Sequence, residues 1–98
     1  MADKYEVRWS DESIQRTDQI VNYLLENWSV KEVKNFLDAL EGFEEIVSRF
    51  PDIYPHSTKK KGYRKAVILK QISVIYSVER KTIKVHTLFD NRQDPSKE

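Results

Sequence analysis

The sequence contains no cysteine, and this absence removes several kinds of chemistry at once. Disulfide bonds and thiol nucleophiles are excluded, and a zinc site would need histidine and carboxylate ligands instead of thiolates. The chain has two histidines, His56 and His86, which is too few for the usual structural zinc sites. We therefore expect neither a bound metal ion nor a cofactor.

Long apolar runs are also missing. No stretch approaches the roughly 18 apolar residues of a membrane-spanning helix, and residues 1–4 lack the core of a signal peptide. We expect a soluble, cytoplasmic protein without a membrane partner. A length of 98 residues is typical of one domain, so we expect a single domain over 1–98, frayed from Ser96 to Glu98.

Charge of both signs is abundant but unevenly distributed. Residues 1–50 hold 11 acidic and 6 basic side chains, whereas residues 51–98 hold 5 acidic and 11 basic ones. The basic excess is densest at 59–65, where five cations surround Tyr63: Lys59, Lys60, Lys61, Arg64 and Lys65. A basic rim on a sheet is typical of proteins that bind polyanions or acidic partners; the alternative is a solvated sheet face.

Capping residues and apolar spacing predict two helices. Ser10, followed by two acids, predicts a helix over 11–27. Ser29 begins a capping box for a second helix over 30–49, which ends before Pro51 because the residue before a proline avoids helical geometry. The short link between the helices predicts an antiparallel helical hairpin.

Alternating apolar and polar residues predict four strands, at about 5–9, 63–69, 72–78 and 82–89. The order β-α-α-β-β-β predicts an α+β fold, with the helical hairpin packed on one face of a mainly antiparallel sheet. Alternation places one set of side chains toward the core: Ile72, Val74, Tyr76, Val78, Ile83, Val85, Thr87 and Phe89. It places another set on the open face: Ser73, Ile75, Ser77, Lys84, His86 and Leu88. Trp9 and Trp28 fall at packing positions and are predicted to belong to the core.

The element order and several motifs resemble the RelE/ParE family of toxins from type II toxin–antitoxin systems, which includes plasmid stabilisation proteins. The resemblance covers roughly residues 4–95. It has six parts: the strand from Tyr5 to Trp9 leading into a helix, Glu26-Asn27-Trp28-Ser29, Ser48-Arg49-Phe50-Pro51, Lys61-Gly62-Tyr63-Arg64-Lys65, Ile75-Tyr76-Ser77-Val78 and Asn91-Arg92-Gln93-Asp94-Pro95. It implies a RelE/ParE-like fold and a growth-inhibiting toxin neutralised by a cognate antitoxin.

The resemblance leaves two macromolecular targets open. ParE-like members inhibit DNA gyrase, whereas RelE-like members cleave mRNA on the ribosome. Where RelE-like proteins have an arginine on the middle strand, this chain has Ser73, and no tyrosine or histidine follows Asp90. These departures favour a ParE-like gyrase inhibitor. The alternatives are a ribosome-dependent mRNA endonuclease, which would be an enzyme, and an inactivated toxin that only binds.

Candidate site residues follow from the chemistry of metal-independent RNA cleavage, which needs an acid, a base and cations around the phosphate. His86 is the acid–base candidate near neutral pH, although a lone strand histidine is otherwise a surface residue. Arg64 and Lys65 are phosphate-binding candidates; they point to opposite faces, and we favour Arg64 on the open face because a guanidinium binds oxyanions with two hydrogen bonds.

The residues predicted to bind the target or the antitoxin share positive charge or an aromatic ring near the open face: Lys59, Lys60, Lys61, Tyr63, Arg64, Lys84, His86 and Arg92. Tyr63 would stack on a base or, as we favour, cover the edge of the core. For Arg92 the plainer interpretation is an ion pair with a neighbouring aspartate in a local turn.

Overall fold

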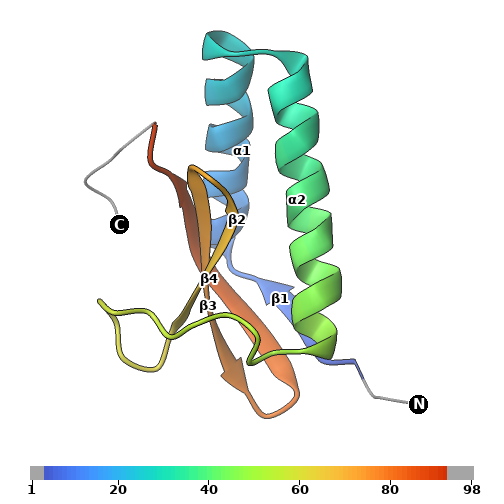
Figure 1. Ribbon diagram of the computed structural model, residues 1–98, viewed down its shortest axis with the longest axis vertical. Coiled ribbons are helices and arrows are strands. Elements are labelled where there is room, and N and C mark those ends of the chain that lie inside the picture. The colour runs from blue at the N-terminus through green and yellow to red at the C-terminus, as the bar shows by residue number, and fades with distance from the viewer. Residues whose placement is uncertain (1–3, 93–98) are drawn as a thin grey trace.

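The computed structural model describes residues 4–92, which form two helices and a four-stranded sheet (Figure 1). The elements in chain order are β1 (Glu6–Trp9), α1 (Asp11–Asn27), α2 (Val30–Arg49), β2 (Arg64–Leu69), β3 (Ile72–Glu79) and β4 (Thr82–Asp90). The predicted α+β order is confirmed, and each predicted element is present. The predictions for residues 93–98 lie outside the described residues.

The sheet has the strand order β1-β4-β3-β2. β1 is parallel to β4, and the other two pairs are antiparallel, which confirms a mainly antiparallel sheet. The helical hairpin carries the chain from β1 at one edge to β2 at the other, and the β2-β3-β4 meander then returns to β1. Within the described part of the chain, no helix is both long and apolar enough to cross a membrane.

Side-chain caps begin both helices as predicted. The Ser10 hydroxyl accepts a hydrogen bond from the Ser13 amide at 3.0 Å, and the Ser29 hydroxyl accepts one from the Glu32 amide at 3.3 Å. The helices run antiparallel, side by side (Figure 1). α1 packs on β4, while α2 packs on β2 and β1, so both helices cover the same face of the sheet.

The core lies between the helices and this face of the sheet. Its members are buried apolar side chains from both layers: Ile20, Leu24, Phe36, Leu40, Phe43, Val47, Ala66, Ile72, Val74, Tyr76, Ile83, Val85 and Leu88. The Tyr76 hydroxyl donates a hydrogen bond to the carbonyl of Pro51 at 2.8 Å. The core therefore also anchors the segment that follows α2.

β4 contains a bulge that simple alternation did not predict. Ile75 pairs with Thr87, but the next residue of β3, Tyr76, pairs with Val85. His86 is therefore an extra residue without a partner on β3. A bulge of this kind bends the strand and changes which face its side chains occupy.

The bulge overturns part of the predicted pattern of faces. Leu88 is fully buried in the core, whereas Thr87 and Phe89 lie on the open face, the reverse of the prediction. The physical reason is that one extra residue shifts an alternation of period two by one position. Lys84 and His86 keep their predicted place on the open side, because Lys84 precedes the bulge and His86 is the bulged residue.

Ser10 joins the start of α1 to this bulge. Its amide donates to the carbonyl of Val85 at 3.0 Å, and its hydroxyl donates to the carbonyl of His86 at 2.8 Å. The same hydroxyl accepts from the amide of Ser13. The Ser10 side chain thus gives a hydrogen-bond partner to the Ser13 amide at the start of α1. It also gives one to the His86 carbonyl at the bulge.

The two tryptophans have different environments. Trp9 is partly buried against the core, and its Nε1 donates to Glu44 Oε2 at 3.0 Å. The prediction that Trp28 belongs to the core is wrong, because its side chain is 54% exposed at the tip of the hairpin. The tip extends beyond the sheet (Figure 1), so Trp28 packs instead beside the guanidinium of Arg92, 5.1 Å from its ring centroid.

We predict that Ser10→Ala lowers the free energy of unfolding by about 2 kcal/mol, because it removes both a helix cap and a bond to the bulge. The matched variant Ser29→Ala removes only an exposed cap, and we expect a loss of about 0.5–1 kcal/mol. Urea denaturation followed by circular dichroism gives both values. Equal losses would show that the bond to His86 contributes nothing.

Candidate functional site

A cleft of about 510 Å³ lies on the open side of the sheet. It is bounded by the first turn of α1, the loop at 57–60, and residues of β2, β3 and β4. Most of its ionisable side chains are basic or aromatic: Lys59, Lys60, Lys65, Tyr63 and His86. Glu12 is the acidic side chain among its lining residues. The positive charge of the second half of the sequence is therefore partly concentrated around one imidazole.

His86 is held in a defined orientation within this cleft. Its Nε2 lies 2.7 Å from the hydroxyl oxygen of Ser77, and its ring lies 4.5 Å from the ring of Tyr63, at an angle of 35°. Burial lowers the pKa of His86, and the ammonium groups of Lys60 and Lys84 lower it further, while Glu12 partly opposes them. The lowered pKa favours the neutral imidazole, which is the form able to accept a proton.

Tyr63 forms a wall of the cleft. The Tyr63 ring contacts the ring of His86, and the Nζ of Lys60 lies 4.8 Å from the centroid of the Tyr63 ring. The expectation that Tyr63 covers the edge of the core is therefore wrong. The reason is that residue 63 lies just before β2, on the side of the sheet away from the helices.

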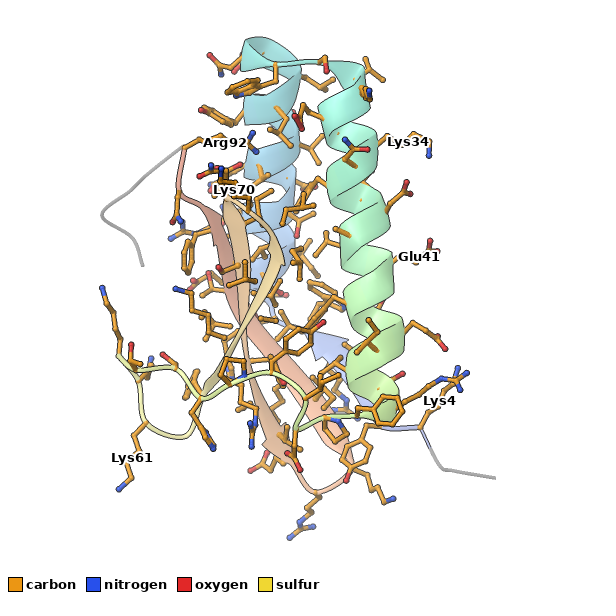
Figure 2. The ribbon with its side chains drawn as sticks, in the orientation of Figure 1. Lys4, Lys34, Glu41, Lys61, Lys70 and Arg92 are labelled. Carbon is orange, nitrogen blue, oxygen red and sulfur yellow. The ribbon has the colours of Figure 1, made fainter. Side chains whose placement is uncertain are left out.

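The basic loop is shaped by its own polar groups. The Ser57 hydroxyl accepts hydrogen bonds from the amides of Lys59 and Lys60, both at 3.2 Å. Gly62 has φ +86, a left-handed conformation that glycine adopts without a steric penalty. Lys59 and Lys60 consequently line the cleft, whereas Lys61 extends away from the body of the protein (Figure 2).

The predicted orientation of Arg64 and Lys65 is reversed in the structure. Arg64 pairs with the buried Tyr76 and lies on the helix side, where its Nη1 donates to the Tyr54 carbonyl at 2.7 Å. Its Nη2 lies 3.4 Å from Asp52 Oδ1. Lys65 lines the cleft instead, with its Nζ 5.7 Å from the ring centroid of Phe89. The strand register decides this, because Ala66 must face the core.

The remaining predicted binding residues lie outside the cleft. Lys84 is on the open face but is ion-paired with Glu79. Arg92 lies beside α1 (Figure 2). It donates three hydrogen bonds to the Asp90 carboxylate: from its amide to Oδ1 at 2.7 Å, from its Nε to Oδ1 at 3.1 Å and from its Nη2 to Oδ2 at 2.8 Å. Asp90 is only 1% exposed. The interpretation of Arg92 as part of a local ion-paired turn is confirmed.

Sequence reasoning missed several cleft residues. Glu12, Ser57 and Phe89 line the cleft, and Ser10 and Ser77 hold His86 from two sides. The open-face pattern of β3 already contained the signal for Ser77, whereas Glu12 was interpreted only as a helix-terminus acid. Among residues 4–92, no group of three or more His, Asp or Glu side chains is arranged to hold a metal ion.

Comparisons with known proteins show that several solved structures have a similar fold. A chain of the chromosomal ParDE TA system from P. aeruginosa has a TM-score of 0.65 at 15% identity, over 89% of this chain and 96% of that one. A chain of the E. coli DinJ–YafQ toxin–antitoxin complex has a TM-score of 0.60 at 13% identity, over 93% and 97%.

A third, the conserved hypothetical protein HP0894 from Helicobacter pylori, has a TM-score of 0.60 at 16% identity, over 90% and 96%. No family model matches the sequence, and no curated protein is similar to it in sequence. At these identities the likeness concerns the fold, which is the RelE/ParE-like fold that the sequence motifs implied.

We predict that the ring protons of His86 titrate with a midpoint below 6.5, the ordinary value for histidine. As the pH falls below about 6.5, the unfolded chain binds this proton before the folded protein does, so the free energy of unfolding decreases until the folded pKa is passed. Proton NMR gives the midpoint, and urea denaturation from pH 5 to 8 gives the stability.

His86→Gln removes this part of the pH dependence, whereas His56→Gln, outside the cleft, retains it. A His86 midpoint at or above 6.5 would contradict the desolvated, cation-rich environment described above.

Proposed function

We propose that this protein is the toxin component of a type II toxin–antitoxin system and acts by cleaving mRNA on the ribosome. The toxin part of the proposal is supported by the fold, which resembles chains from two toxin–antitoxin systems over about nine-tenths of this chain. The six parts of the sequence that resemble the RelE/ParE family, in the same order, also support it.

One observation favours RNA cleavage over the other target: an oriented imidazole, whose pKa is lowered, lies in an open cleft among lysines. A phosphodiester substrate needs cations to bind its charge, and a 2′-hydroxyl needs a base that is unprotonated at neutral pH. His86 would supply the base, and Lys59, Lys60 and Lys65 would supply the positive charge. A surface that only binds protein has no need of this arrangement.

The reaction would proceed in one displacement. His86 removes the 2′-hydroxyl proton, and the 2′ oxygen attacks the neighbouring phosphorus. The bond from phosphorus to the 5′ oxygen breaks, which leaves a 2′,3′-cyclic phosphate and a 5′-hydroxyl end. A lysine ammonium of the cleft, with Lys60 the best placed beside the Tyr63–His86 pair, neutralises the phosphate and donates the proton that the leaving oxygen needs.

A second candidate, inhibition of DNA gyrase, rests on a different observation. The chain of the ParDE system has a higher TM-score than the chain of the DinJ–YafQ complex, 0.65 against 0.60. The absence of an arginine at Ser73 and of a tyrosine or histidine after Asp90 also favours it. We rank it second because it gives no role to the oriented imidazole.

The partner that we propose is a cognate antitoxin whose segment covers the cleft. Lysines at the rim and the apolar side chains of Ile75 and Phe89 below them suit an acidic segment with apolar anchors. Such a segment would block the same lysines that RNA needs. The protein would act in the cytoplasm, where ribosomes are found.

We predict that His86→Gln slows ribosomal mRNA cleavage by roughly 10²-fold, the usual contribution of one positioned acid–base group. The assay is primer extension on mRNA from translating ribosomes, with His56→Gln as a control that keeps wild-type activity. The proposal is wrong if the wild-type protein produces no ribosomal cuts and instead causes gyrase-dependent DNA breaks.

We predict that the double variant Lys59→Ala/Lys60→Ala loses most growth inhibition, because it removes two charges from the cleft. The control Lys61→Ala/Lys70→Ala removes the same charge from positions outside the cleft and retains inhibition. Growth curves after induction, at matched protein levels, measure both. Equal toxicity of the two variants would show that the basic loop is only a solvated surface.

A further inference from the structure

His86 is constrained by three neighbours that come from three different parts of the chain. The Ser10 hydroxyl, before α1, holds its carbonyl at 2.8 Å. The Tyr63 ring, before β2, packs on its ring at 4.5 Å, and the Ser77 hydroxyl, on β3, lies 2.7 Å from its Nε2. Within residues 4–92 this contact with Ser77 is the sole hydrogen bond of the imidazole.

The direction of the hydrogen bond with Ser77 determines the role of the other ring nitrogen. A neutral imidazole has one N–H and one lone pair, so a bond at one nitrogen selects what the other presents. If Nε2 carries the proton and donates it to the Ser77 oxygen, Nδ1 carries the lone pair. A base is needed in the cleft, and Nδ1 is the nitrogen that Ser77 leaves free.

We propose that Ser77 is the positioning residue for this base: its oxygen accepts the Nε2–H of His86 and keeps the lone pair on Nδ1, which takes the 2′-hydroxyl proton. This inference rests on the proposed function. It assigns a role to a side chain that does not itself react, and it identifies which nitrogen does.

The bulge makes the contact possible. In the ladder Ser77 pairs with Lys84, and Tyr76 pairs with Val85, so His86 has no partner of its own. The extra residue bends the strand at this point, and the imidazole contacts Ser77. A histidine at a regular position of the strand would have a cross-strand partner on β3.

Charge explains why such a bond matters during the reaction. When Nδ1 takes a proton, the imidazole becomes a cation facing Lys60 of the loop and Lys84 of β4, with Glu12 of α1 as the opposing charge. The bond from Nε2 to Ser77 becomes charge-assisted at that moment and therefore stronger. Ser77 thus favours the protonated state that the neighbouring lysines disfavour.

The tautomer is measured directly by long-range ¹H–¹⁵N correlation NMR of the histidine rings at pH 8. We expect His86 of the wild-type protein to carry its proton on Nε2. We expect Ser77→Ala to show averaged nitrogen shifts from mixed tautomers, and Ser77→Thr to restore the wild-type shifts. A proton on Nδ1 in the wild-type protein, or identical shifts in Ser77→Ala, would overturn the inference.

Cleavage kinetics test whether Ser77 contributes to catalysis. We expect Ser77→Ala to lower the rate by about tenfold, part of the roughly 10²-fold that the base contributes, and Ser77→Thr to recover it. Loss of the charge-assisted bond also lowers the His86 pKa further, so the rising limb of the pH–rate profile moves to lower pH. Ser73→Ala, on the same strand and outside the cleft, should match the wild-type rate and profile.

The two proposals fail in distinguishable ways. If the wild-type protein cuts mRNA but Ser77→Ala cuts equally fast with an unchanged pH profile, the positioning role is wrong and the proposed function stands. If the wild-type protein cuts no mRNA on ribosomes, the proposed function is wrong, and the catalytic role of Ser77 falls with it whatever the NMR shifts show.

Discussion

The extra residue in β4 is the constraint on which the rest of the site depends. Without it, Thr87 and Phe89 would face the helices, and Leu88 would face solvent. With it, Leu88 completes the core, and the open side gains His86 and Phe89 as neighbours in one cleft. A small local irregularity thus decides both how the core packs and which side chains line the cleft.

The basic loop takes its position from contacts made on the opposite side of the sheet. The Arg64 guanidinium binds the Tyr54 carbonyl, and the Tyr76 hydroxyl binds the Pro51 carbonyl, so the segment after α2 is attached to the core at two points. The Lys65 amide binds the Pro55 carbonyl at 3.0 Å. Residues 57–62 are then directed to the open side, where Lys59 and Lys60 reach the cleft.

The fold and the function rest on different observations. The overall fold is similar to that of chains of the ParDE and DinJ–YafQ systems, with TM-scores of 0.65 and 0.60 at identities of 15% and 13%. One fold of this kind accommodates different targets, because activity depends on the side chains placed on it. In the function that we propose, those side chains are the oriented His86, its Tyr63 and Ser77 neighbours, and the lysines around them.

The sequence by itself determined the elements, their order and their ends, because these depend on local interactions. Ser10 and Ser29 cap their own helices, Pro51 acts on the residue before it, and alternation reports which strands bury one face. The tertiary structure alone decided the bulge at His86, the reversed faces of Arg64 and Lys65, and the exposure of Trp28. Each of these depends on a partner distant in the sequence: the register between strands, or the length of a hairpin relative to the sheet beneath it. Periodicity within one segment carries no information about such a partner.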